Sequence, residues 1–179
     1  IVEQSIVADD VKKIIDAFPG AAHPMGVLSS LTSALTAFNP DDVSLDYARS
    51  KEEMYNTIVK VMGKIPVLIS WTFRKKNGFP LEYSSKTRNL DYVENILQMM
   101  FKRPNEDYVQ NTVLVDVLNK LLILHADHEQ NCSTSTVRIV GSAQTGLFAS
   151  ISAGISALWG PLHGGANQAV LEMFNAIKE

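Results

Sequence analysis

The amino-acid sequence predicts an all-α protein of about eight helices. Its apolar residues recur at spacings of three and four along most of the chain, which is the period of an amphipathic helix. No segment alternates between apolar and polar residues for long, and no internal repeat of fixed period is present. With 179 residues and 46% hydrophobic content, the chain is long enough to bury one sizeable core.

Two helices are predicted before residue 40. The first covers residues 7–18 and ends near the Phe-Pro-Gly at residues 18–20, and the second covers residues 25–38. The Asn-Pro-Asp-Asp that follows predicts a turn.

Four more helices are predicted in the middle of the chain. One covers residues 45–63, and the next starts at Pro66, because the first turn of a helix tolerates proline. The other two cover residues 93–101, with Asn89 or Asp91 as the N-cap, and residues 108–127.

The last part of the chain is rich in small, neutral residues. Residues 136–158 contain many Gly, Ala and Ser, which allow helix backbones to approach closely in a core or a subunit interface, and a final helix is predicted from Pro161. Residues 139–171 contain no charged side chain, but polar residues, Gly and Pro interrupt them too often for a membrane span.

Composition excludes several classes of function. The formal net charge of −3, with scattered basic residues, does not provide the positive field that nucleic-acid binding requires. Cys132 is the only cysteine, so no internal disulfide can form, and we expect it to be a small buried side chain in a cytoplasmic protein. The chain starts without Met and stops inside a helical pattern, so we expect a piece of a longer protein.

The stretch Leu124–Asn131 places an unusual polar cluster at the end of a helix. His125 and His128 are three residues apart on one face, which permits a metal site but lacks the usual spacing of four and any cysteine cluster. The alternative is that His125 packs in the core while His128 caps the C-terminus of the helix, where a cation is favoured.

A fourth histidine, His163, lies in the stretch Trp-Gly-Pro-Leu-His-Gly-Gly, in the first turn predicted after Pro161. A helix N-terminus disfavours imidazolium, so His163 is expected to stay neutral and donate a ring N–H. Such a donor can polarise a carbonyl and stabilise an enol. Gly164 and Gly165 are expected to allow tight helix packing, and they would also leave the ring accessible to a ligand.

Two stretches carry a resemblance to a known family. The segment HADHEQNCSTSTVR (125–138), followed by WGPLHGGANQAVLEMF (159–174), resembles the citrate synthases of the bacterial short-subunit type, and HPMGVLSSLTSAL (23–35) is compatible with them. The resemblance implies an all-α acyltransferase of the tricarboxylic acid cycle that condenses acetyl-CoA with oxaloacetate, and a homodimer or higher homo-oligomer. It implies no cofactor beyond acetyl-CoA as co-substrate, and no metal.

The resemblance also implies roles for single residues. His163 matches the histidine that holds the thioester oxygen and stabilises the enol, and His128 matches the one that binds oxaloacetate. Asn131 and Ser133 match the segment that lines the oxaloacetate pocket and supports the catalytic histidine, and His125 is expected to give structural support.

Part of the family pattern is missing from this sequence. Family members carry a second catalytic histidine in a GxGH-type segment, and then the carboxylate base, in a smaller domain. We therefore expect residues 1–162 to be part of the large domain and residues 163–179 to begin the small one, and the chain alone to be inactive. The alternatives are a 2-methylcitrate synthase acting on propionyl-CoA, and a non-catalytic helical dimerisation module.

Overall fold

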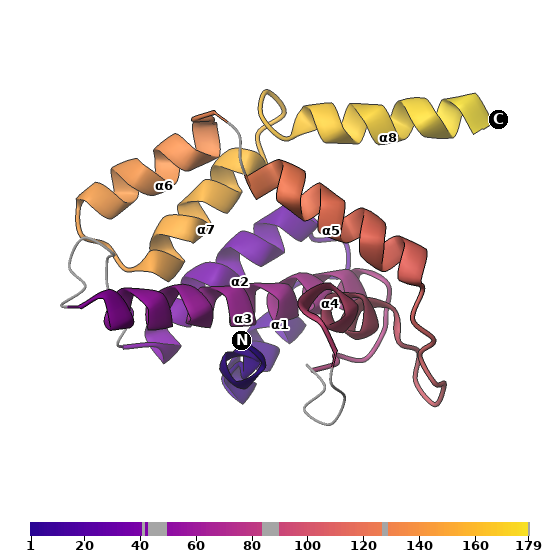
Figure 1. Ribbon diagram of the computed structural model, residues 1–179, viewed down its shortest axis with the longest axis horizontal. Helices are drawn as coiled ribbons and strands as arrows, with labels where there is room; N and C mark the ends of the chain where they lie inside the picture. The colour runs from indigo at the N-terminus through magenta and orange to yellow at the C-terminus, as the bar shows by residue number, and fades with distance from the viewer. Residues whose placement is uncertain (41, 43–49, 84–89, 127–128, 179) are drawn as a thin grey trace.

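The computed structural model describes residues 1–40, 42, 50–83, 90–126 and 129–178. These residues form eight α-helices and one short 3₁₀ helix, and none of them lies in a β-strand (Figure 1). The predicted all-α class is therefore confirmed. The elements in chain order are η1 (Val2–Ser5), α1 (Asp9–Ala17), α2 (Pro24–Phe38), α3 (Lys51–Lys76), α4 (Tyr92–Phe101), α5 (Thr112–Ala126), α6 (Cys132–Ser142), α7 (Leu147–Leu158) and α8 (Gly165–Lys178).

The predicted break at Pro66 is wrong, because α3 continues through it from Lys51 to Lys76. A proline inside a helix removes one N–H, so the carbonyl four residues earlier, that of Met62, loses its partner. The hydroxyl of Tyr92 on α4 donates to this carbonyl at 3.0 Å. A side chain from another helix thus replaces the missing donor, and nothing local in the sequence reveals this.

Replacing Tyr92 with Phe is expected to lower the free energy of unfolding by about 1–2 kcal/mol, because the Met62 carbonyl would lose its donor. Burial raises the pKa of the Tyr92 hydroxyl above its ordinary value of 10.0. The unfolded chain therefore releases this proton at a lower pH than the folded protein does. The stabilisation by Tyr92 should be complete below about pH 10 and decrease as the pH rises further, which urea unfolding at several pH values measures.

Tyr55→Phe is the matched control, because Tyr55 lies on α3 with 67% of its surface exposed. Its free energy of unfolding should stay within about 0.5 kcal/mol of the wild type. Equal losses in the two variants would show that the Met62 carbonyl does not depend on Tyr92.

The starts of α4 and α5 depend on local caps. Asp91 is the N-cap residue of α4, as one of the two sequence options predicted, and its backbone N–H donates to Glu94 Oε2 at 2.9 Å. α5 starts at Thr112, four residues later than predicted, because the side chain of Asn111 accepts a hydrogen bond from the N–H of Leu114 at 3.0 Å. The asparagine before the apolar row was the signal for this start.

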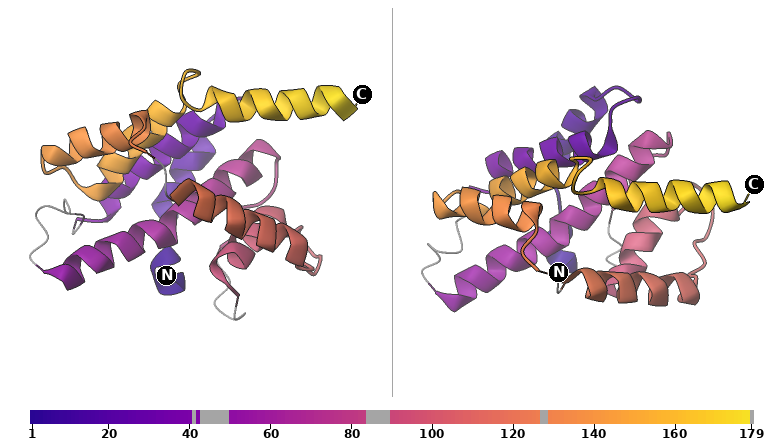
Figure 2. Two further views of the ribbon diagram at one scale, coloured as in Figure 1. Left: turned by 45° about the horizontal axis from the view of Figure 1, so that its top comes forward. Right: turned by 90° about the horizontal axis from the view of Figure 1, so that it is seen from above.

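The core lies where α1, α2, α3 and α7 meet. α2 packs between α3 and α7, and α7 in turn carries α6 on its outer side (Figures 1 and 2). Most of the largest buried side chains of the core come from these helices, including Ile15, Leu31, Leu68, Trp71 and Phe148. α4 adds Met99. The α6–α7 pair is thereby fixed on the body of the protein.

Serine side chains join α2 to α7. Ser29 Oγ donates to the Ser152 carbonyl at 3.1 Å, and Ser152 Oγ donates back to the Ser29 carbonyl at 2.8 Å. Ser156 Oγ lies 2.7 Å from Ser29 Oγ. Small side chains with their own hydrogen-bond partners let the two helix backbones approach closely, as the small-residue segment predicted.

The N-terminus of α7 is held by a side chain from a distant part of the chain. Asp42 Oδ1 and Oδ2 each accept a backbone hydrogen bond at 3.0 Å, from Leu147 and Phe148 respectively. Burial raises the pKa of the Asp42 carboxyl above its ordinary range, although these two N–H groups oppose the shift. The sequence predicted only a turn here, so this capping role was missed.

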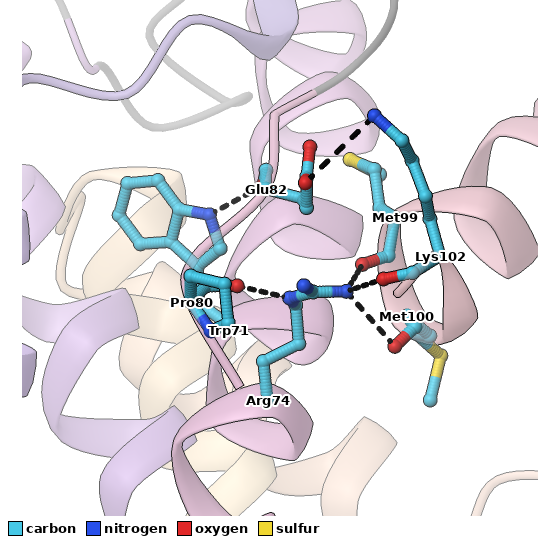
Figure 3. A network of polar contacts seen from close by, with 7 residues as sticks. All are labelled: Trp71, Arg74, Pro80, Glu82, Met99, Met100 and Lys102. Atoms are coloured by element: carbon cyan, nitrogen blue, oxygen red, sulfur yellow. Dashed lines mark hydrogen bonds and ion pairs between the residues drawn. The ribbon is translucent and has the colours of Figure 1, made fainter. Parts of the chain in front are cut away.

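Arg74 at the end of α3 is fully buried and binds main-chain carbonyls (Figure 3). Its Nη1 donates to Met99 at 3.1 Å, to Met100 at 3.3 Å and to Lys102 at 2.7 Å, and its Nε donates to Pro80. Three of these carbonyls belong to the C-terminal end of α4, where helix carbonyls have no intrahelical partners. One side chain therefore fixes the end of α4 and the segment after α3.

Two helices expose most of their apolar side chains. No residue of α5 or α8 is buried, and Val113, Ile123 and Leu124 on α5 are each 71% exposed. In all three views α8 extends away from the rest of the protein (Figures 1 and 2). No helix among the described residues is both long and apolar enough to cross a membrane.

Candidate functional site

The candidate site lies where the start of α6 meets the turn between α7 and α8. Asn131 and Ser133 are at the N-terminus of α6, and His163 is in the turn. The structure brings these three sequence-predicted residues into one hydrogen-bonded group. α7 sets their separation, because it packs along α6 and ends directly before the turn.

The prediction that His163 lies in the first turn of a helix is wrong, because α8 begins only at Gly165. It belongs instead to a tight turn in which the Gly160 carbonyl accepts hydrogen bonds from the N–H groups of His163, at 2.9 Å, and Gly164, at 3.0 Å. A Cβ atom on Gly164 would overlap the carbonyl of Leu158. The close packing expected at this glycine is therefore supported by the geometry.

The ring of His163 is at the N-terminus of α6. The helix end that contacts the ring is therefore that of α6 and not that of α8, the helix that follows His163 in the chain. The Ser133 backbone N–H donates to Nε2 of His163 at 3.3 Å. This N–H is one of the first-turn donors that have no partner within a helix. A backbone N–H can only donate, so Nε2 must be unprotonated and the neutral ring carries its proton on Nδ1, a tautomer assigned from the hydrogen-bond pattern.

Asn131 organises the residues around this bond. Its Oδ1 accepts from the Thr134 N–H at 2.9 Å, which makes it the N-cap of α6, and from Ser133 Oγ at 2.8 Å. Ser133 Oγ also lies 3.0 Å from Nε2 of His163. With Nε2 unprotonated, the one hydroxyl proton of Ser133 is donated either to Asn131 Oδ1 or to Nε2, so the serine links the asparagine to the histidine.

Nδ1 of His163 makes no hydrogen bond to any residue that the structure describes. The side chain is half-buried, so this N–H remains available to a ligand. A neutral imidazole with one fixed nitrogen and one free N–H is a hydrogen-bond donor of defined direction. That arrangement can polarise a carbonyl oxygen.

The two histidines of α5 are less well defined by the structure. His125 is exposed, so its expected packing in the core is wrong, although its Nδ1 does bond to the backbone, to the Leu121 carbonyl at 2.7 Å. The imidazole lies on α5, a helix in which no residue is buried. His128 and its neighbour Asp127 lie outside the described residues, so the role expected of His128 remains a prediction.

Cys132 is exposed, so its expected burial is also wrong. It occupies the first position of α6, directly after the N-cap residue Asn131. Within the described ranges, no three His, Cys, Asp or Glu side chains gather closely enough to hold a metal ion.

One contact beside the site was not predicted. The ring of Trp159 stacks on the ring of His23, with centroids 4.8 Å apart and an interplanar angle of 25°. The sequence gives no local signal for this pair, because the two residues are far apart along the chain. The Trp-Gly-Pro-Leu-His stretch indicated a role for the histidine but none for the tryptophan that precedes it.

Fold and site together define an all-α protein whose candidate centre is a neutral histidine held by the N-terminus of a neighbouring helix. The family model described as "Citrate synthase, C-terminal domain" matches residues 1–179. The chain therefore belongs to the citrate synthase family, as the two sequence motifs indicated.

Individual relatives agree with this assignment. Citrate synthase 1 of Mycobacterium tuberculosis (strain ATCC 25618 / H37Rv) is 47% identical over 179 residues, which are 100% of this chain and 40% of that protein. Citrate synthase of Corynebacterium glutamicum is 47% identical over 97% of this chain and 39% of its own length. The chain thus spans about 40% of the length of the curated relatives that it matches.

Solved structures show the same fold. The crystal structure of citrate synthase from Pyrobaculum aerophilum matches 98% of this chain and 43% of its own chain, with a TM-score of 0.82 and 29% identity. Citrate synthase from Thermotoga maritima matches with a TM-score of 0.72 at 24% identity, over 98% of this chain and 42% of its own, a likeness of fold alone.

Proposed function

We propose that this protein condenses acetyl-CoA with oxaloacetate to give citrate and CoA, and that His163 is the catalytic donor. The observation that carries the proposal is the hydrogen bond from the Ser133 N–H to Nε2 of His163, which leaves Nδ1–H free. The 47% identity to named citrate synthases supports the choice of substrates.

In the proposed reaction, Nδ1–H of His163 donates to the thioester oxygen of acetyl-CoA. A carboxylate base removes a methyl proton, and this hydrogen bond stabilises the enolate that forms as charge develops on its oxygen. The enolate carbon attacks the keto carbon of oxaloacetate, so the C–C bond forms and the thioester carbonyl is restored. The electron pair of the keto C=O π bond moves to its oxygen, which takes up a proton to become the hydroxyl of citryl-CoA. Hydrolysis of the citryl thioester then releases citrate and CoA.

The oxaloacetate pocket is proposed to lie at the C-terminal end of α5 and the start of α6. His128 would bind the substrate, and Asn131 and Ser133 would line the pocket while they orient His163. Their connected hydrogen bonds, at 2.8 Å and 3.0 Å, support an orienting role. His125 would support the end of α5, and no cofactor besides the acetyl-CoA co-substrate is proposed.

This chain is proposed to be an incomplete part of the enzyme and to be inactive alone. It spans about 40% of its relatives, and its sequence contains no GxGH segment for a second catalytic histidine. Residues 163–179 would begin the small domain, a division that the extension of α8 away from the other helices supports (Figure 1). Residues 1–162 would be part of the large domain.

The protein is also proposed to be cytoplasmic and to form a homodimer or a higher homo-oligomer through the small-residue segment 143–158. An open groove of about 350 Å³ between α6 and α7 supports this, because its lining is largely apolar and includes Val137, Ile151, Ile155 and Leu158. Light scattering coupled to size exclusion would measure the assembly, and a monomer at micromolar concentration would contradict this part of the proposal.

The test of the reaction is CoA release from acetyl-CoA and oxaloacetate, measured on the longest natural form of the protein that contains this sequence and on the 179-residue chain. We expect turnover by the long form and none by the short one. Activity with propionyl-CoA but not acetyl-CoA would favour the 2-methylcitrate reaction. Inactivity of the long form with both would favour the dimerisation module.

A further inference from the structure

Trp159 directly follows α7 and precedes the turn that carries His163. It is the last residue before this turn that contacts the body of the protein. Its N–H donates to the Ile155 carbonyl at 3.0 Å, which continues the helical pattern of α7. Its indole stacks on the imidazole of His23. His23 is itself fixed as the N-cap of α2, since its Nδ1 accepts from the Met25 N–H at 3.2 Å.

The indole also lies close over the first turn of α2. A Cβ atom placed on Gly26 would be 3.3 Å from two ring carbons of Trp159, which is closer than side chains normally pack. The absence of a side chain at position 26 therefore makes room for the indole. The serines of α2 and α7 join the two helices elsewhere, so the turn of α2 that Trp159 contacts is held in place relative to α7.

The turn after Trp159 has few other attachments. Pro161 is exposed, and Leu162 is fully exposed at 104% of its reference surface. At the far end of the turn, the ring of His163 contacts α6 through Ser133. The turn is thus held at two points, by Trp159 on α2 and by the His163 ring on α6.

We propose that Trp159, supported by His23, is a positioning residue that sets the tautomer and direction of His163; this rests on the proposed catalytic role of His163. The Ser133 N–H to Nε2 distance is 3.3 Å, already long for a hydrogen bond. A small displacement of the turn would break it. The Nε2-protonated tautomer, which would donate to Ser133 Oγ, would then compete, and Nδ1 would lose its proton.

Trp159→Ala in the longest natural form of the protein is expected to lower kcat by 10-fold to 100-fold, the effect of a small misplacement of a catalytic group. The KM for oxaloacetate should change less than about threefold, because Trp159 does not line the proposed pocket. Trp159→Phe, which keeps a ring to stack on His23, should recover most of the kcat.

Phe101→Ala is the matched control. Phe101 is 43% exposed against 45% for Trp159, and it also belongs to an aromatic pair, with its centroid 5.2 Å from that of Phe73. It lies on α4, away from the turn. A loss of kcat in Phe101→Ala as large as in Trp159→Ala would overturn the proposal, because a general loss of packing would then explain both.

Gly26→Ala displaces the indole without removing it. Alanine favours the helix more than glycine does, so the variant should unfold at no lower temperature than the wild type, yet its kcat should fall severalfold. Gly20→Ala is the control, because a Cβ atom there would meet nothing within 4 Å. Unchanged kcat in Gly26→Ala would count against the proposal even if Trp159→Ala failed to fold.

His23→Asn tests the support of the indole separately. Asparagine is an effective N-cap residue, so the start of α2 is preserved while the stacked ring is lost. We expect a kcat between those of the wild type and Trp159→Ala. A kcat equal to the wild type would show that the His23 ring does not hold Trp159.

Nitrogen NMR of selectively ¹⁵N-labelled histidine separates this proposal from the proposed function. In the wild type His163 should show protonated Nδ1, and in Trp159→Ala a mixture of the two tautomers. An unchanged tautomer in Trp159→Ala would overturn the positioning role whatever the activity. If the tautomer shifts but His163→Ala retains full turnover, the positioning role holds and the catalytic role of His163 fails.

Discussion

His163→Ala is expected to lower kcat for citrate formation by about 10²-fold to 10³-fold, the usual loss when a donor to a developing oxyanion is removed. The donor is Nδ1–H, which is free because the Ser133 N–H occupies Nε2. The KM for oxaloacetate should change much less, since that substrate is proposed to bind through other residues. Steady-state kinetics on the longest natural form of the protein measures both constants.

Ser133→Ala provides the comparison. It removes the Oγ contacts with Asn131 and with Nε2 of His163 but keeps the backbone N–H that donates to this nitrogen, so kcat should fall less than about tenfold. If Ser133→Ala were as inactive as His163→Ala, the hydroxyl rather than the backbone N–H would hold the ring. A fully active His163→Ala would remove this histidine from the mechanism.

Arg74→Met should lower the free energy of unfolding by about 3 kcal/mol, the largest stability effect that we expect from a single substitution. Methionine fills similar volume but supplies no donor, so the carbonyls of Pro80, Met99, Met100 and Lys102 would lose this partner in a buried region (Figure 3). Burial lowers the pKa of the Arg74 guanidinium below its ordinary value. Urea unfolding followed by circular dichroism measures the loss.

Lys75→Met, at the next position of α3, is the control for removing a positive charge. Lys75 Nζ is 3.7 Å from the exposed carboxylate of Asp16 and donates to a single main-chain carbonyl, that of Asp16, at 3.2 Å, so the loss should stay below about 1 kcal/mol. Similar losses in the two variants would mean that the charge, and not the carbonyl contacts, accounts for the effect of Arg74. A loss below 1 kcal/mol in Arg74→Met would mean that water can replace the guanidinium.

The sequence alone predicted most helices well where their signals are local. α1, α2 and α4 follow apolar rows with recognisable ends, and the structure places them within about two residues of the predicted bounds. The predictions failed where a distant partner changes the outcome. Pro66 was predicted to start a helix. The helix can continue through it because the hydroxyl of Tyr92 donates to the Met62 carbonyl, which the proline leaves without a partner.

The site divides in the same way. His163 could be singled out from the sequence because a histidine beside glycines after a helix-starting proline is rare and specific. The prediction placed the ring at the N-terminus of its own helix, whereas α6 and not α8 supplies the N–H that contacts it. His125 was expected to pack in the core, but its side chain is exposed on α5.

The sequence by itself determined the helical class and the family, because periodicity and motifs are properties of neighbouring residues. The tertiary structure decided which distant groups meet: Asp42 with α7, Arg74 with the end of α4, and Trp159 with His23. The physical reason is that these contacts gain their energy from burial and from unpaired backbone groups, and neither exists until the helices have packed.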